Sequence, residues 1–507
     1  MKFSKRSMPR RNAISVTEAR SFMNARFLLP GFYLAIFLLL FLQAAAYAQL
    51  SSQIRYAIDR SQASDAFWVV QVRDSSGALL EDLNGGKLVR PASNLKLVSS
   101  GAFLEKLGTD YRFKTRLYGR GEQVGDRWRG DLIIRGSGDP SINGDFYEDP
   151  LFLFEKWFRV LASMGIREID GNIIAWDGLF DDIPYPRGWE WDDLSYYYAP
   201  EINALSFNSN VVNLEVVAEG EAGSTPQIQW FPFNTPYVEF INEQVITPPS
   251  AGYNESYRRI LGTNTIVLRS TLPQGYYETE PLSVMAPSLY FIDTFSRYLE
   301  QSGIRFSGQL LTDSDYYSWS DDNLELIDTH TSEPLFRMVE WLNQESDNFF
   351  TEMLTKVLAV EEYDAQGSTE LGLNVIKEFM HSTGFDTLSV MLRDASGMAP
   401  STLLKASDLN RYLVTIQKEP WFSYLYESLS IGGVNGTLGH RFRNGSLREN
   451  FIGKTGFSSG VRSLSGYLQT ESGKWLTVTI VTNNYTARTS HVDWVHERIL
   501  EYLYNGY

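Results

Sequence analysis

Ser93 and Lys96 stand three residues apart, just after Pro91, where an apolar run of helical period begins. In a helix, side chains three positions apart share a face, so the serine hydroxyl and the lysine amine can meet. A neutral amine could accept the serine proton, and burial together with a second cation would supply that neutral form by lowering the lysine pKa. A lone Ser-x-x-Lys is frequent by chance, so an ordinary surface helix is the competing interpretation.

A second motif, Ser346-Asp347-Asn348, falls at the break between two strongly periodic helical stretches. A hydroxyl and an amide held at such a break could relay a proton and bind a substrate amide. The same residue types are common helix N-caps, which is the competing interpretation. Ser-x-Asn also occurs at Ser141 and Ser206, so the motif has weight only together with its structural setting.

Lys454-Thr455-Gly456 is the third motif, and it lies at the end of a predicted strand. A cation here could bind a substrate carboxylate, and by like-charge repulsion it could lower the pKa of Lys96. The glycine would let a substrate backbone come close to the strand. A plain strand end is the competing interpretation, so the decision depends on the order and settings of all three motifs.

Those three motifs, in that order and in those settings, resemble the signature of β-lactamases and penicillin-binding proteins. The long separation of Ser93 from Ser346 narrows the resemblance to the class C low-molecular-mass penicillin-binding proteins, which are D-alanyl-D-alanine carboxypeptidase/endopeptidases. The resemblance covers nearly all of the chain after residue 48. Other segments similar to that family are 130–142, 197–212, 393–401, 432–441 and 452–468.

The resemblance implies an acyl-transfer mechanism in which Ser93 is the nucleophile and Lys96 its general base. Ser93 would be acylated by the D-Ala-D-Ala end, or by the cross-link, of peptidoglycan stem peptides, and the ester would then be hydrolysed. Ser346 would pass a proton to the leaving amine. β-Lactam antibiotics would form a long-lived ester with Ser93. The resemblance implies no cofactor and no metal.

Substrate binding is implied for Asn348, which would hold the substrate amide, and for the strand motif. Lys454 would attract the terminal carboxylate and tune Lys96, while Thr455 and Gly456 would lie along the bound peptide. The backbone N–H groups of Ser93 and Phe457 would form the oxyanion hole.

Two positions depart from the family pattern. Phe457 stands where a threonine or serine is usual, so a hydroxyl that helps to hold the substrate carboxylate is lost. Ala395 replaces a glycine of the 393–401 turn. In addition, the family can hold diaminopimelate between an aspartate and a phenylalanine, and Asp177 and Phe180 are the residues that this chain offers.

The elements that must position these motifs predict an α+β fold. Two strands near the start and three near the end predict one five-stranded antiparallel sheet flanked by helices and built from both chain ends. Short β-like runs broken by Gly, Pro, Asn and Asp predict inserted β-rich domains between the Ser-x-x-Lys and Ser-x-Asn motifs. The expected limits are 49–112 for the first part of the penicillin-binding domain, 113–286 for the insert and 287–507 for the second part.

Residues 1–48 read as a signal peptide, with a basic start, an apolar stretch and Ala46-Tyr47-Ala48 before a cleavage site at Gln49. We therefore expect export to the periplasm, and an uncleaved membrane anchor is the alternative. The net charge of −16 becomes about −22 without this segment, which opposes binding to nucleic acid. There is no cysteine, and none of the five histidines pair as His-x-x-x-His, so neither a thiol nucleophile nor a metal site is expected.

Two other functions remain open on the sequence. Gly456 to Gly460 fits the Gly-x-Ser-x-Gly turn of α/β-hydrolases, with Ser458 as nucleophile and with Asp493 and His496 following in the right order. That turn leads from a strand into a helix, whereas another strand pattern follows here. The second alternative is a cell-wall-binding protein on the same scaffold with little or no activity, for which Phe457 is the best support.

Overall fold

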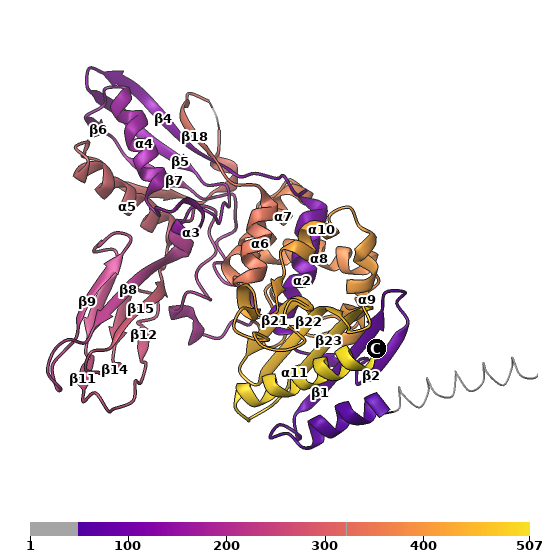
Figure 1. Cartoon of the computed structure of the whole chain (residues 1–507). Helices are drawn as coiled ribbons and strands as arrows, with labels where there is room; N and C mark the ends of the chain where they lie inside the picture. The colour runs from indigo at the N-terminus through magenta and orange to yellow at the C-terminus, as the bar shows by residue number, and fades with distance from the viewer. Residues whose placement is uncertain (1–48, 321) are drawn as a thin grey trace, which may run out of the picture.

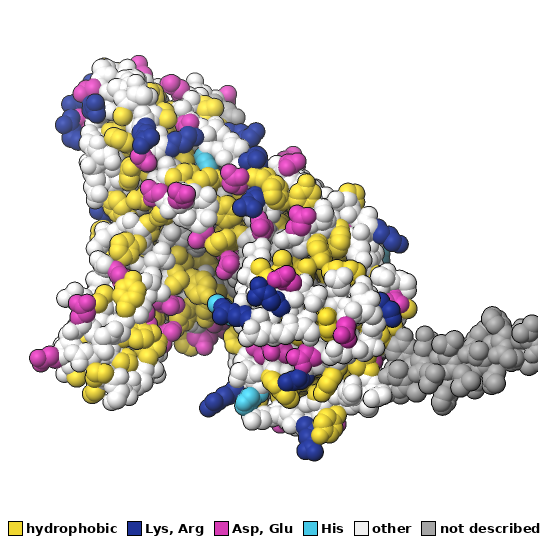
Figure 2. Space-filling model, viewed as in Figure 1, with side chains coloured by type: hydrophobic (Ala, Val, Ile, Leu, Met, Phe, Trp, Pro, Cys, Tyr) yellow, Lys and Arg dark blue, Asp and Glu magenta, His cyan; other side chains and the backbone are white. Residues whose placement is uncertain are grey.

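The computed structural model describes residues 49–320 and 322–507 as two bodies joined by several chain crossings (Figure 1). The body on the right of Figure 1 contains both ends of the described chain, and the arm on the left consists of the inserted residues. We call the body on the right the main body, and we call the part of the arm with strands β8 to β15 (residues 211–283) the lower arm. Figure 2 shows a hollow between the lower arm and the main body, with hydrophobic side chains along it. Within the described residues, no helix combines the length and apolar character needed to cross a bilayer.

The main body is built on an antiparallel sheet of six strands in the order β2-β1-β23-β22-β21-β20. The α+β class predicted from the sequence is confirmed, but the count of five strands is one short. The additional strand is β20, which has only two residues and pairs with the start of β21, so it has too few positions to show an alternating pattern. The bounds are β1 Phe67–Asp74, β2 Leu79–Leu83, β20 Ser430–Ile431, β21 Phe451–Ser458, β22 Val461–Gln469 and β23 Trp475–Asn483.

Both faces of this sheet are covered, which explains why β23 is buried at eight of its nine positions. One face packs against α11 (Thr489–Gly506) and the helix over residues 49–59. The other face packs against α9 (Ala406–Thr415) and the helical layer. A strand buried on both faces reads as a continuous apolar run, and the sequence of β23 has that form.

The helical layer surrounds α2 (Lys96–Lys106), whose first nine residues are all buried. A serine turn, η1 (Ala92–Leu95), leads directly into this helix. Burial on every side makes α2 a rigid support for the residues at its start. The helices packed around it are α6 Leu335–Gln344, α7 Asn348–Tyr363, α8 Thr369–Ser382 and α10 Phe422–Glu427.

The upper arm is a mixed sheet of seven strands covered by two helices, α4 (Phe152–Ser163) and α5 (Pro287–Gln301). Helix α5 and three later strands lie after residue 286, yet they pack with the insert and not with the main sheet. The limit predicted at 286/287 stays a prediction, and these contacts favour a later one. The strands are β4 Lys114–Val124, β5 Arg127–Arg135, β6 Glu168–Asp170, β7 Ile173–Trp176, β16 Arg305–Phe306, β17 Leu310–Asp313 and β18 Glu325–Thr331.

The lower arm consists of three small sheets that share one hydrophobic core with the upper arm. It confirms that β-rich structure interrupts the main fold between the Ser-x-x-Lys and Ser-x-Asn motifs. Its strands are β8 Val211–Val217, β9 Gln227–Phe231, β10 Glu239–Asn242, β11 Val245–Thr247, β12 Tyr257–Arg259, β13 Thr265–Leu268, β14 Thr271–Pro273 and β15 Tyr277–Ser283.

Candidate active site

Ser93 lies in the 3₁₀ turn η1, and α2 begins only at Lys96. The sequence predicts a regular helix from near Pro91, so the start of the element differs. A 3₁₀ turn has three residues per turn, which aligns positions i and i+3 one above the other. Lys96 Nζ accordingly donates a hydrogen bond of 3.0 Å to Ser93 Oγ. The local geometry therefore brings hydroxyl and amine together more directly than an α-helix would.

The Lys96 ammonium is fully buried and held at three points. Besides Ser93, it donates to Asn348 Oδ1 at 2.6 Å and to the Ser396 carbonyl at 3.1 Å. Burial lowers the pKa of Lys96 to about 8, against the opposing effect of nearby carboxylates, of which Asp394 is the strongest. An amine in this range supplies a useful neutral fraction near neutral pH, which is what a general base requires.

The Ser-x-Asn motif occupies the break between α6 and α7. Ser346 adopts a left-handed φ of 62°, and its side chain is half-buried. Asp347 caps α7, because its Oδ1 accepts from the Phe350 N–H at 2.9 Å. The N-cap interpretation therefore holds for the aspartate and not for Ser346 or Asn348.

Asn348 is already hydrogen-bonded at both ends of its amide. Its oxygen accepts from Lys96, and its nitrogen donates to the Tyr198 carbonyl at 2.8 Å and contacts Met398 Sδ at 3.4 Å. The sequence predicts that Asn348 binds a substrate amide. In this structure its amide fixes the position of the Lys96 ammonium, and the role in binding a substrate amide stays a prediction.

Lys454 is fully buried on β21, and its ammonium donates to the Thr455 carbonyl at 3.0 Å. Burial holds the pKa of Lys454 well below its usual range, and the positive charges of Lys96 and Arg462 lower it further. The sequence predicts that Lys454 lowers the pKa of Lys96. Burial is the main cause for both amines, and the lowering of the Lys96 pKa by Lys454 stays a prediction.

The rest of the strand motif presses against the serine turn. A Cβ atom on Gly456 would overlap Ser463 Oγ and would lie 3.0 Å from the backbone nitrogen of Ser93, so only glycine fits. Thr455 is 5% exposed, and its hydroxyl donates to Thr437 Oγ1 at 2.8 Å. Phe457 is 61% exposed.

Glu352 is a buried site residue that the motif analysis missed. It lies on α7 one turn after Asn348, and its Oε1 accepts from the backbone N–H groups of Ala395 (3.0 Å) and Ser396 (2.9 Å). Since the Ser396 carbonyl receives the Lys96 ammonium, Glu352 indirectly positions that lysine. Burial raises the pKa of Glu352 to about 8, with Asp394 adding to the effect. A glutamate inside an apolar helical period was the available signal.

The insert also reaches the site, which the sequence did not predict. Trp189 donates its indole N–H to Asp394 Oδ2 at 3.2 Å, and Tyr198 supplies the carbonyl that holds Asn348. Trp191 and Tyr197, on the same segment, are 63% and 53% exposed. The segment 197–212 was recognised by its similarity to the family, but similarity alone did not reveal these contacts.

Asp177 and Phe180 lie in the interior, away from these contacts. Asp177 is 6% exposed and accepts from Asn203 Nδ2 at 2.9 Å and Ser314 Oγ at 2.6 Å. Phe180 is 2% exposed and packs in the core of the helical layer, with the Lys356 ammonium over its ring. Their role in binding diaminopimelate stays a prediction, and the structure gives both side chains contacts within the fold.

The α/β-hydrolase alternative is wrong. Ser458 ends β21 and β22 follows after a two-residue turn, so the segment is a hairpin and not a strand-to-helix turn. Asp493 is bound by Arg462 at 2.6 and 3.0 Å. His496 is buried and hydrogen-bonded to Thr482. No hydrogen bond joins these three residues into a triad in the described part of the chain.

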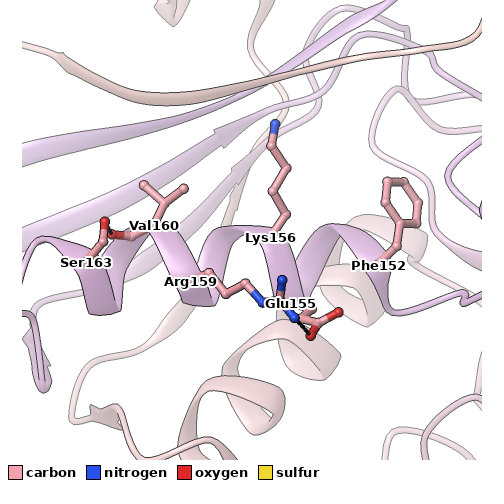
Figure 3. Close-up of a pocket in the computed structure, with 6 residues that line it drawn as sticks. All are labelled: Phe152, Glu155, Lys156, Arg159, Val160 and Ser163. Carbon is pink, nitrogen blue, oxygen red and sulfur yellow. Dashed lines mark hydrogen bonds and ion pairs between the residues drawn. The ribbon is translucent and has the colours of Figure 1, made fainter.

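A separate surface hollow lies on α4, far from the motifs in sequence, and is drawn in Figure 3. All of its lining side chains come from that one helix: Phe152, Glu155, Lys156, Arg159, Val160 and Ser163. Its charged side chains already form ion pairs: Glu155 pairs with Arg159, and Lys156 pairs with Asp328. Among the described residues, no group of three or more His, Cys, Asp or Glu side chains is arranged to hold a metal ion.

The turn that carries Ser93 leads into a helix and packs against a Lys-Thr-Gly strand of an antiparallel sheet. This is the arrangement of the penicillin-recognising serine enzymes. Comparison with known families narrows the class. Residues 50–497 match the model of the D-Ala-D-Ala carboxypeptidase 3 (S13) family, and the chain belongs to this family.

The chain is similar to two D-alanyl-D-alanine carboxypeptidases along most of its length. It is 30% identical to the D-alanyl-D-alanine carboxypeptidase of Actinomadura sp. (strain R39) over 453 residues, which cover 86% of this chain and 81% of that protein. It is 25% identical to D-alanyl-D-alanine carboxypeptidase DacB of Haemophilus influenzae over 412 residues, which cover 80% and 83%.

The fold is shared with penicillin binding protein 4 (dacB) of Haemophilus influenzae. Its crystal structure superimposes with a TM-score of 0.77 at 22% identity, covering 89% of this chain and 98% of that one. A second structure of that protein, complexed with a novel β-lactam, gives a TM-score of 0.71 at 21% identity, covering 89% and 99%. The likeness establishes the common architecture of main body and insert.

Proposed function

We propose that this protein is a serine-type D-alanyl-D-alanine carboxypeptidase that works through an acyl-enzyme on Ser93. The observation that carries the proposal is the Lys96 amine, which is buried, has a pKa lowered to about 8 and lies 3.0 Å from Ser93 Oγ. Within the described residues, no thiol or hydrogen-bonded Ser-His pair offers another activated nucleophile. Membership of the family supports the same reaction.

The remaining site residues take their roles from this step. Lys96 accepts the Ser93 proton as the hydroxyl attacks the carbonyl of the D-Ala-D-Ala bond. The backbone N–H groups of Ser93 and Phe457 stabilise the oxyanion, since β21 runs directly against the serine turn. Ser346 relays this proton from Lys96 to the leaving amine, and water then hydrolyses the ester and frees Ser93. Lys454 offers its buried amine to the substrate carboxylate, because within the described residues this amine donates to the Thr455 carbonyl and forms no ion pair.

The substrates that we propose are peptidoglycan stem peptides, cleaved at their D-Ala-D-Ala end and also at their cross-links. We propose that the peptide chain lies in the hollow between the main body and the lower arm (Figure 2). The related protein of Haemophilus influenzae is described in complex with a β-lactam, which supports the proposal that β-lactams acylate Ser93 here.

We also propose that residues 1–48, which lie outside the described residues, direct export to the periplasm and are then removed. The support is the sequence pattern alone. Mass spectrometry of the exported protein should find a chain that begins near Gln49. A chain that keeps Met1 in the membrane fraction would favour the anchor instead.

Fluorescent penicillin tests the acyl-enzyme. We expect the label on Ser93, its loss in Ser93→Ala and in Lys96→Ala, and its retention in Ser458→Ala, which is the serine control on the β21–β22 hairpin. Ser93→Ala should remain folded by circular dichroism. A label that persists without Ser93 would exclude the proposed nucleophile. If the protein labels but releases no D-alanine from defined muropeptides, the binding-protein alternative is correct.

A further inference from the structure

The 3₁₀ turn η6 (Gly436–Leu438) lies between the strand motif and the Ser-x-Asn break. It contacts β20, β21 and α6. Gly436 has a left-handed φ of 52°, and a Cβ atom there would overlap Ser430 Oγ and lie 3.0 Å from the Gln344 carbonyl. Gln344 is the last residue of α6, two positions before Ser346. Thr437 is therefore held at the junction of the two motifs.

Thr437 belongs to a chain of three hydroxyl groups. Thr455 Oγ1 donates to Thr437 Oγ1 at 2.8 Å, and Ser430 Oγ lies 3.3 Å from the same oxygen. Ser430 is fully buried and Thr455 is 5% exposed, whereas Thr437 is half-buried. A hydroxyl can accept two hydrogen bonds and still donate its own proton. Thr437 Oγ1 can thus accept from both neighbours while its own proton stays free for another acceptor.

The strand motif otherwise lacks a donor at this point. Phe457 has no hydroxyl, and its ring is exposed beside the Arg462 guanidinium, 6.0 Å from the ring centre. That guanidinium is bound to Asp493 by two hydrogen bonds, so it is committed. The Thr455 proton is used on Thr437. A carboxylate drawn toward Lys454 would therefore find the lysine amine but no free hydroxyl at position 455 or 457.

We propose that Thr437 supplies this donor and binds the C-terminal carboxylate of the substrate in place of the hydroxyl lost at Phe457. The inference rests on the proposed carboxypeptidase function and identifies a specificity-determining residue for it. The accepted hydrogen bond from Thr455 polarises the Thr437 hydroxyl and strengthens its donation to an anion. The site consequently favours peptides with a free terminal carboxylate over peptides that end in an amide.

Paired substrates test the assignment with the mature protein. Peptides ending in D-Ala-D-Ala are compared with their C-terminal amides, and kcat/KM is measured for each. Thr437→Val keeps the shape but removes the hydroxyl, so kcat/KM for the free acid should fall roughly tenfold to a hundredfold, as for loss of a hydrogen bond to a charged group. The value for the amide should change less than about twofold. Thr437→Ser should retain the preference for the acid.

A matched control is Thr415→Val, because Thr415 is exposed at the end of α9 and its hydroxyl bonds only to the Arg411 carbonyl. It should leave both substrates unchanged. Phe457→Thr should restore the acid preference in Thr437→Val, since it returns a hydroxyl to β21. Equal losses for acid and amide, or a normal preference in Thr437→Val, would overturn the inference. Failure of the unsubstituted protein to cleave either peptide would refute the proposed function instead.

Discussion

Replacing Lys96 by methionine should abolish penicillin labelling and should also remove the loss of folding stability that burial of this amine causes. Lys96 is fully buried, and burial lowers its pKa from 10.5 to about 8. The unfolded chain therefore binds this proton more tightly than the folded protein. The stability contributed by Lys96 is fully present above pH 10.5 and is lost as the pH falls to 8.

The magnitude follows from the size of the pKa shift. A difference of one pKa unit is worth about 1.4 kcal/mol, so the change from 10.5 to about 8 corresponds to about 3 kcal/mol of stability lost below pH 8. Between pH 7 and pH 9.5 the same relation gives a gain of about 2 kcal/mol for the unsubstituted protein relative to Lys96→Met. The hydrogen bonds that Lys96→Met removes add an offset of opposite sign that varies little with pH.

The assay is urea unfolding of both proteins from pH 7 to pH 9.5. The difference in unfolding free energy should rise with pH in favour of the unsubstituted protein, while penicillin labelling is lost in Lys96→Met at every pH. The exposed Lys418, replaced by methionine, is the control, because its removal uncovers no buried charge. A difference that stays flat, or that falls with pH, would refute the claim that Lys96 is held with a lowered pKa.

Two further substitutions test the residues that hold Ser93 and Lys96 in position. Gly456→Ala should slow penicillin acylation at least tenfold with a modest loss of Tm, because the added Cβ forces β21 away from the Ser93 backbone; an unchanged acylation rate would contradict this packing. Glu352→Gln removes a carboxyl whose pKa is raised from 4.5 to about 8, so the stability of the unsubstituted protein relative to this variant should fall as the pH rises from 4.5 to 8, by a few kcal/mol. Urea unfolding across that range measures it, and a pH-independent difference would show that Glu352 ionises normally.

The architecture of the main body was predictable because its strands are long and strongly patterned. Strands β1, β21, β22 and β23 each have eight or nine residues, so their periodicity is clear even without a partner. The two-residue β20 carries no such signal and is defined only by its pairing with β21. The sequence also could not show that α5 packs with the insert, because its amphipathic pattern indicates that one face is buried but not what covers it.

The candidate site was predictable to the extent that its chemistry lies in short motifs. Ser93 and Lys96 are only three positions apart in one turn, so their contact follows from local sequence. Asp177 and Phe180 were chosen by residue type alone, and type does not distinguish a side chain facing a substrate from one committed to the fold. Glu352 was visible only as a charged residue at a core position of a helix, which is a signal of burial but not of role.

Asn348 shows that contacts across the two bodies give a motif residue a role that its motif does not reveal. Its identity and place after Ser346 indicate substrate binding, but its amide nitrogen is held by the Tyr198 carbonyl, 150 positions away in the insert. Its oxygen, fixed by that contact, receives the Lys96 ammonium at 2.6 Å. Since a carbonyl carries no sequence signature, this link could not be inferred from residue types. The insert is consequently part of the machinery that positions Lys96, and a shift of the segment around Tyr198 would be transmitted through one amide to Lys96.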